Sequence, residues 1–105
     1  MDNIDTLAEF LKALSDPTRL RIVKLLGDCN TGLCNGGPLC VNALANQLAI
    51  TQSAVSQHLR ILRSAGLVSG TRTGTFMHYA LNREEIEKCS ALLRATLGKE
   101  FTVNG

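Results

Sequence analysis

Residues 41–68 contain two short helical patterns separated by only a few residues, and no other feature of the chain limits the fold as much. Apolar residues recur at spacings of three and four before Thr51 and again after it, as on one apolar face of a helix. These apolar positions are Val41, Leu44, Ala45 and Leu48 in the first pattern, and Val55, Leu59 and Leu62 in the second. The Thr51 hydroxyl suits the start of the second helix, because it can accept a hydrogen bond from a free N–H of the first turn, and Gly66 suits its end. We therefore predict a helix-turn-helix over residues 41–66.

The second of these helices has a polar outer face. If its apolar residues face inward, helical geometry places five polar residues on the opposite side, namely Gln52, Ser53, Ser56, Gln57 and Arg60. Amides and hydroxyls pair with base edges in a DNA major groove, and Arg pairs with guanine or phosphate. On the same helix, we interpret His58 as a packing or phosphate-contacting residue rather than a metal ligand. A solvated surface helix has a similar polar face, so this pattern alone leaves both interpretations open.

Residues 68–81 resemble two short strands joined by a glycine-bracketed turn. Along the second strand, Phe76, His78 and Ala80 alternate with Met77, Tyr79 and Leu81, as on the two faces of a strand, and Arg72 falls near the tip of the hairpin. A helix-turn-helix followed by such a hairpin is typical of a winged helix, in which the hairpin, or wing, reaches the DNA backbone or minor groove. The predicted fold is mainly α with a small β-hairpin, in the order α-α-α-α-β-β-α.

The distribution of charge supports a surface that faces phosphate. The formal net charge is only +2, but no acidic residue occurs between Asp28 and Glu84. The basic residues in this window are Arg60, Arg63, Arg72 and Arg83. The predicted helix-turn-helix and wing therefore hold the positive surplus, as expected for a partner of double-stranded DNA.

Four segments, in this order, resemble the ArsR/SmtB family of metal-sensing repressors. They are residues 13–22 (ALSDPTRLRI), 39–45 (LCVNALA), 51–59 (TQSAVSQHL) and 62–68 (LRSAGLV). The resemblance extends over about residues 5–97 and implies a small homodimeric winged-helix repressor that leaves its operator when a metal or metalloid binds.

The flanking segments supply further helices to a single domain over residues 1–105. Residues 5–14 predict an amphipathic helix with Ile4, Leu7, Ala8, Leu11 and Leu14 on one stripe. A second helix begins at Pro17 after Asp16 as its N-cap. We expect its core side to consist of Leu20, Ile22, Val23, Leu25 and Leu26, and its basic residues Arg19, Arg21 and Lys24 to be solvated rather than bound to phosphate.

A last helix is predicted over residues 83–97, with Asn82 as its N-cap. Its apolar stripe contains Ile86, Cys89, Leu93 and Leu97. The core is already assigned to other helices, so we expect this stripe and that of residues 5–14 to form the contacts of a homodimer, as the resemblance also implies.

Three of the four cysteines, Cys29, Cys34 and Cys40, fall within twelve residues in and after a glycine-rich segment, residues 28–38, that looks like an insertion relative to the family. Three thiolates suit trigonal As(III), Sb(III) or Pb(II), whereas Cd(II) or Zn(II) needs a fourth ligand. We predict these three as metal ligands, with arsenite or antimonite the first candidate effector and no obligatory cofactor.

Two other interpretations of the cysteines stay open. Cys40 is also compatible with a small buried hydrophobe, and Cys29 and Cys34 with a redox-sensitive disulfide. Cys40 matches the first Cys of the family's Leu-Cys-Val-Cys motif, but Asn42 stands where the second Cys occurs. Cys89 is expected in the core or an interface, and His78 is expected to be structural. The absence of His from residues 82–105 argues against the zinc site that the family builds on its C-terminal helices.

Other classes of protein fit the chain less well. It contains no nucleophile elbow, phosphate-binding glycine loop or paired core carboxylates, so we do not expect an enzyme. It shows neither a signal peptide nor a membrane-spanning run, which predicts a cytoplasmic protein with reduced thiols. The sequence thus predicts a repressor released from DNA by a thiophilic ion, with a thiol redox or persulfide sensor on the same fold as the alternative.

Overall fold

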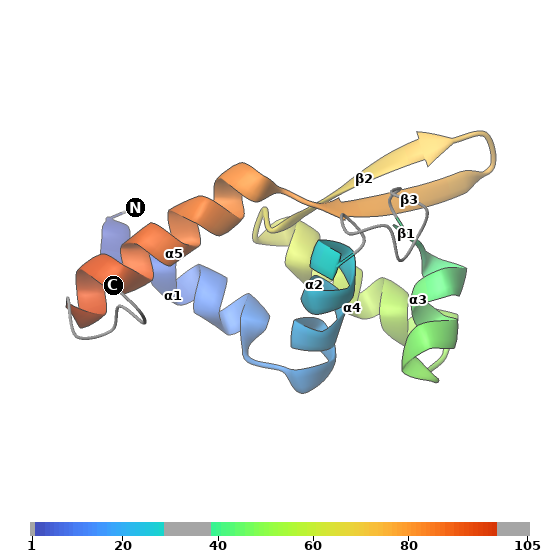
Figure 1. Ribbon diagram of the computed structural model, residues 1–105, viewed down its shortest axis with the longest axis horizontal. Coiled ribbons are helices and arrows are strands. Elements are labelled where there is room, and N and C mark those ends of the chain that lie inside the picture. Colours follow the sequence, from blue (N-terminus) through green and yellow to red (C-terminus); the bar gives the residue numbers. More distant parts are fainter. Residues whose placement is uncertain (1, 29–38, 99–105) are drawn as a thin grey trace.

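Helices pack on one small sheet in the computed structural model, which describes residues 2–28 and 39–98 (Figure 1). The elements follow in the order α1 (Asn3–Leu14), α2 (Pro17–Asp28), β1 (Leu39–Cys40), α3 (Val41–Leu48), α4 (Gln52–Ser64), β2 (Val68–Thr73), β3 (Phe76–Leu81) and α5 (Arg83–Leu97). The predicted helix-turn-helix corresponds to α3 and α4, and the predicted wing to β2 and β3. The winged-helix fold is confirmed.

Side-chain caps determine where the helices begin. Asp16 Oδ2 accepts hydrogen bonds from the backbone N–H groups of Thr18 and Arg19, at 2.8 and 3.1 Å, at the start of α2. Thr51 Oγ1 accepts from the N–H of the third residue of α4 at 3.0 Å, and Asn82 Oδ1 accepts from the third residue of α5 at 3.5 Å. These three N-caps are confirmed, because each depends on residues only two or three positions apart.

The turn of the helix-turn-helix contains a strained residue. α3 ends at Ala49, whose φ of 56° is left-handed, and the next N–H, that of Ile50, bonds to Ala45 O at 3.2 Å. A left-handed conformation costs a residue with a Cβ roughly 1–2 kcal/mol. Gly66, with φ of 82°, follows α4 without that cost. The direction of the chain into and out of α4 is therefore set by backbone geometry.

The sheet has one more strand than the sequence predicts. Its order is β1-β3-β2, and all pairs are antiparallel. β2 and β3 form the predicted hairpin, with Val68 opposite Leu81 at one end and Thr73 opposite Phe76 at the other. β1 has only two residues and places Cys40 opposite His78. Such a short strand has no alternation of its own, and its partner lies far along the chain.

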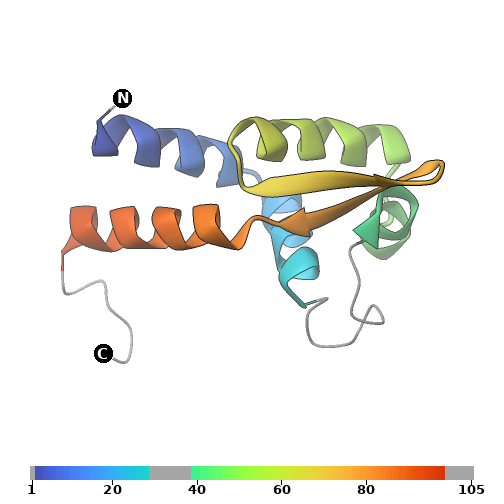
Figure 2. The ribbon, with the colours of Figure 1, turned by 90° about the horizontal axis from the view of Figure 1, so that it is seen from above.

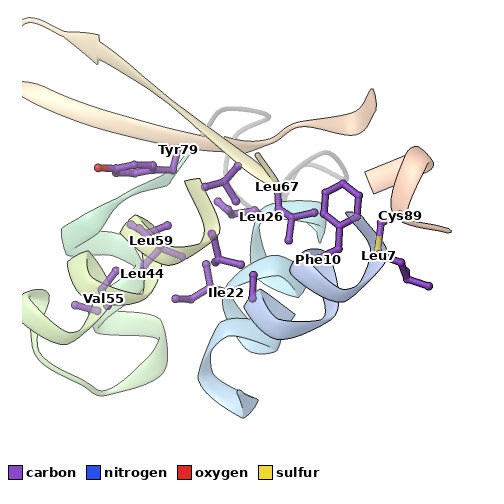
Figure 3. Packing of buried hydrophobic residues seen from close by; sticks show 14 residues of the cluster. Leu7, Phe10, Ile22, Leu26, Leu44, Val55, Leu59, Leu67, Tyr79 and Cys89 are labelled. Carbon is purple, nitrogen blue, oxygen red and sulfur yellow. The ribbon is translucent and has the colours of Figure 1, made fainter. Parts of the chain in front are cut away.

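The core lies between the sheet and the helices, and every helix contributes at least one buried side chain to it (Figure 3). Its most deeply buried side chains are Ile22, Leu44, Val55, Leu59, Leu62 and Leu67. The inward face predicted for α4 is confirmed. Leu20, predicted in the core, is instead 51% exposed. Ile22 and Leu26 define the buried side of α2, and Leu20 lies two residues before Ile22, about 200° around the helix.

The predicted stripe of α1 is divided between the interior and the surface. Leu7 of that stripe is buried, whereas Ile4 and Leu11 are 59% and 41% exposed. Phe10 and Ala13, which were not predicted in the stripe, are buried as well. α1 and α5 run side by side at the end of the molecule opposite the hairpin tip (Figure 2). On α5, Leu97 is 54% exposed. Apolar side chains therefore remain uncovered on both helices.

The helices in the described part of the chain are all too short or too polar to cross a membrane.

Candidate nucleic-acid interface

The outer side of α4 is a continuous polar surface. The five predicted residues, which we call the polar face of α4, are all exposed: Gln52, Ser53, Ser56, Gln57 and Arg60. The buried residues Val55, Leu59 and Leu62 hold the opposite side of the helix against the core. This packing leaves the hydroxyls, amides and guanidinium of the polar face available to a partner.

Arg72 lies in β2, opposite Met77 of β3 and close to the turn of the hairpin. Its side chain is exposed. Figure 2 shows the hairpin extending beyond α4 at the end of the molecule away from α1 and α5. The structure thus places Arg72 on the wing, as the sequence predicts.

His58 differs from the other predicted DNA-binding residues because its side chain is turned inward. Its Nδ1 lies 3.3 Å from Arg19 Nη1 and 4.0 Å from Asp16 Oδ2. Arg19 also donates from Nε to Ala13 O at 2.6 Å, so the expectation that Arg19 is merely solvated is wrong. The three side chains connect α4 to the junction of α1 and α2.

Asp16 carries a stable negative charge in this cluster. Its pKa is lowered from the ordinary value, first by the backbone N–H of Arg19, and further by that of Thr18 and by the electrostatic effect of the nearby His58 and Arg19 side chains. Desolvation acts in the opposite direction but is outweighed. Asp16 therefore serves both as a helix cap and as a fixed anion beside His58.

An open hollow of about 440 Å³ lies between α4 and β3. Its lining residues are Ser56, Arg60, Arg63, Ser64 and Tyr79. Arg63 Cζ lies 6.0 Å from the centre of the Tyr79 ring, within the range of a cation–π contact. The sequence analysis counts Arg63 in the positive surplus of this surface, but it names none of Arg63, Ser64 and Tyr79 as a DNA-binding residue. The available signal was the spacing of Arg60 and Arg63, which puts two guanidiniums on adjacent turns of one helix.

The arginines of this surface lack carboxylate partners. Within residues 39–83, all of which the structure describes, the sequence has no Asp or Glu. In the part of the chain that the structure describes, the ion pairs involve Lys24 with Asp28 and His58 with Asp16. Arg60, Arg63 and Arg72 are therefore exposed cations that pair with no carboxylate among the described residues.

Cys40 caps the helix that precedes α4. Its half-buried Sγ accepts a hydrogen bond from the backbone N–H of Ala43 at 3.4 Å. Sulfur is a weak acceptor, so this cap is weaker than one made by oxygen. Cys40 also borders a hollow of about 360 Å³, together with Gln52 of α4 and Met77 of the wing. The thiol is thus close to both DNA-facing elements.

A side-chain hydrogen bond connects the first turns of α3 and α4. Gln52 Nε2 donates to Asn42 Oδ1 at 3.0 Å. Asn42 lies two residues after the Cys40 thiol, and Gln52 belongs to the polar face of α4. This bond therefore connects the first turn of α3, next to the Cys40 thiol, with the polar face of α4.

The other predicted metal ligands, Cys29 and Cys34, lie outside the described residues. Among residues 2–28 and 39–98, no three His, Cys, Asp or Glu side chains gather as a metal site. Cys89 is 7% exposed, and burial raises the pKa of its thiol. Its assignment to the core or an interface is consistent with this position, near Leu7 and Phe10 (Figure 3). His78 is half-buried in β3.

Comparison with known proteins gives relatives that are regulators of transcription. An uncharacterized HTH-type regulator of Methanocaldococcus jannaschii, MJ1325, is 33% identical, with 89% of this chain and 97% of the relative covered. The SmtB homolog of Synechocystis, a transcriptional repressor, is 41% identical over 77% of this chain, and the match spans only 55% of the relative. The arsenical resistance operon repressor of Bacillus subtilis is 40% identical, with 71% and 65% covered.

Solved structures show the same architecture. A crystal structure of a possible transcriptional regulator for arsenical resistance superposes with a TM-score of 0.73 at 35% identity, and 88% of each chain is covered. A homodimeric winged helix-turn-helix DNA-binding domain from Mycobacterium bovis gives a TM-score of 0.68 at 30% identity, with 90% of this chain and 80% of that chain covered. Both the fold and the relatives are those of DNA-binding regulators and not of enzymes.

The family model of bacterial regulatory proteins of the arsR type matches residues 16–69, which include α2, α3 and α4. This family match agrees with the relatives over most of the chain and with the winged-helix fold. The chain belongs to the ArsR family of bacterial regulatory proteins.

Proposed function

We propose that this protein is a homodimeric transcriptional repressor that binds operator DNA and is released when its thiols bind a soft metal or metalloid. The observation that carries the DNA-binding half is the polar face of α4, exposed along the helix in a part of the chain without a carboxylate. In a winged helix, this face enters the major groove and the wing, with Arg72, reaches the neighbouring backbone or minor groove.

The dimer presents two copies of α4 to successive major grooves. Their separation must be about 34 Å, one turn of the double helix, so the operator is expected to be pseudo-palindromic. Ile4 and Leu11 on α1 and Leu97 on α5 supply uncovered apolar surface for the contact between copies. The homodimeric domain from Mycobacterium bovis supports this assembly.

Cys40 is the sensing residue in this proposal, with Cys29 and Cys34 completing the thiolate set. Thiolates select soft ions, and a set of three suits As(III) or Sb(III) first and then Pb(II) or Cd(II). The arsenical resistance operon repressor of Bacillus subtilis supports a metalloid among the effectors of this chain. The protein is expected to act in the cytoplasm, where the thiols stay reduced.

Release follows from the position of Cys40 at the start of α3. A sulfur held by a metal takes its position from the metal, which weakens its hydrogen bond to the N–H of Ala43. Displacement of this turn strains the hydrogen bond between Asn42 and Gln52, and Gln52 belongs to the polar face of α4. A few kcal/mol of difference between the two states is enough to weaken DNA binding on the order of a hundredfold.

The test is Cys40→Ser, which keeps a cap acceptor and removes the thiolate. Fluorescence anisotropy on an operator obtained by in vitro selection should show that As(III) weakens binding by the wild type on the order of a hundredfold. The Cys40→Ser variant should bind the same operator with unchanged affinity and ignore As(III). Cys89→Ala is the matched control, since its buried thiol has no part in the proposed site, and it should respond as the wild type does.

Three results would change the proposal. Release of Cys40→Ser by As(III) would contradict the assignment of Cys40. Release of the wild type by peroxide or polysulfide, but not by As(III), would replace metal sensing by the redox or persulfide alternative. Failure of the wild type to bind duplex DNA at low ionic strength would contradict the function as a whole.

A further inference from the structure

We propose that the hollow between α4 and β3 binds a phosphate of the DNA backbone, with Arg63, held on the Tyr79 ring, as the principal ligand. This inference deepens the proposed function and rests on it. It adds Arg63, Ser64 and Tyr79 to the interface, and it assigns them to the sugar–phosphate backbone rather than to the bases.

The chemistry of the hollow suits a phosphate. Two guanidiniums, from Arg60 and Arg63, and two hydroxyls, from Ser56 and Ser64, line one open space of about 440 Å³. These groups are hydrogen-bond donors, and guanidiniums bind phosphate oxygens through paired, charge-assisted hydrogen bonds. Among the described residues, no carboxylate forms an ion pair with Arg60 or Arg63. The hollow therefore carries positive charge without an internal counter-ion.

Tyr79 restricts the position of Arg63. Tyr79 is 8% exposed, and the guanidinium carbon of Arg63 lies 6.0 Å from the centre of its ring. Gly70 faces Tyr79 across the hairpin, and a Cβ at Gly70 would come within 3.1 Å of the ring. The ring thus occupies space that any other residue at position 70 would invade. A guanidinium stacked on a fixed ring has less freedom to lose when it binds an anion.

The position of the hollow indicates which part of DNA fills it. When α4 enters the major groove and the wing lies over the adjacent minor groove, one sugar–phosphate strand must pass between them, because that strand separates the two grooves. The hollow lies between α4 and β3, on that path. Base edges face into the grooves on either side, so a phosphate is the group that reaches Arg63.

The experiment compares Arg63→Gln with the wild-type dimer on two duplexes of about 30 base pairs, roughly three helical turns. One duplex carries the selected operator and the other a random sequence. The dissociation constant is measured between about 50 and 300 mM NaCl. Each phosphate contact contributes about 0.9 to the slope of log affinity against log salt, and the dimer has two hollows. The slope should fall by about 2, and the affinity should fall by the same factor, roughly tenfold or more, on both duplexes.

Matched variants separate a phosphate contact from damage to the fold. Arg94→Gln removes an exposed arginine of α5 whose Nη2 bonds to Ser90, and it should leave the slope unchanged. Tyr79→Leu should weaken binding, and the double variant with Arg63→Gln should be no weaker than Arg63→Gln alone, because the ring acts through the arginine.

Each outcome has a definite meaning. An unchanged salt slope for Arg63→Gln overturns the phosphate assignment, while DNA binding by the wild type would leave the proposed function in place. A loss of affinity on the operator but not on random DNA also overturns it, because Arg63 would then contact a base. If the wild type binds neither duplex, both this inference and the proposed function are overturned.

Discussion

α3 and α4 begin with nearly the same backbone geometry but with different acceptor atoms. Cys40 caps α3 with φ and ψ of −86° and 166°, and Thr51 caps α4 with −73° and 153°. The N–H three residues later donates to sulfur at 3.4 Å in α3 and to oxygen at 3.0 Å in α4. The cap of α4 is thus an oxygen, while the cap of the helix before it is a sulfur, which is a weaker acceptor. In the proposed function, this sulfur is the group that a metal binds, one helix away from the polar face of α4.

The largest effect on stability is expected from Thr51→Ala. Removing the hydroxyl leaves N–H groups of the first turn of α4 without their acceptor, which should lower the free energy of unfolding by about 1 kcal/mol, within a range of 0.5–2. Urea denaturation measures this, with the protein concentration held fixed because a dimer gains stability with concentration. Thr51→Ser keeps the oxygen and is the control. If both variants lose the same free energy of unfolding, the stabilisation comes from the methyl group of Thr51 and not from its capping hydroxyl.

A smaller effect of opposite sign is expected from Cys40→Ser. Oxygen accepts a hydrogen bond better than sulfur, so the free energy of unfolding should rise by about 0.5 kcal/mol. The same urea experiment provides the measurement, with Cys89→Ser as the contrast. Cys89 is buried without a capping role, so serine there should destabilise the protein. A loss of about 1 kcal/mol in Cys40→Ser would refute the idea that the start of α3 is weakly capped.

The smallest effect at neutral pH is expected from Asp16→Asn, which tests a third kind of cap, a charged one. The pKa of folded Asp16 lies below its ordinary value of 3.8, first because of the Arg19 backbone N–H. The carboxylate therefore contributes stability above that value, and this contribution is lost as the pH falls through the folded pKa. Asparagine also caps helices but does not titrate there. Thermal unfolding between about pH 5 and pH 3 should show a steeper fall for the wild type than for the variant, and parallel curves would contradict this.

Features encoded within a few residues were predictable from the sequence. The caps Asp16, Thr51 and Asn82 act on the next turn of the chain, and the inward face of α4 follows from the spacing of Val55, Leu59 and Leu62. The polar face of α4 is the other half of the same periodicity, so it was predicted together with the core.

Features that depend on residues far apart in the sequence were not predictable. Cys40 pairs with His78 in the sheet, and Arg19 contacts His58 across 39 positions. The hollow beside Arg63 exists only because β3 brings Tyr79 next to α4. A stripe of alternating polar and apolar residues predicts a strand, but it does not show which helix will lie beside it.

In the proposed mechanism, the hydrogen bond between Asn42 and Gln52 affects the effector concentration that is needed to release the protein from DNA. A coupling between two binding sites is reciprocal. If the effector lowers the affinity for DNA by a given factor, bound DNA lowers the affinity for the effector by the same factor. In the proposed mechanism, a cell with more copies of the operator therefore needs a higher effector concentration to start transcription. The threshold of that response is then set by the gene copy number as well as by the protein.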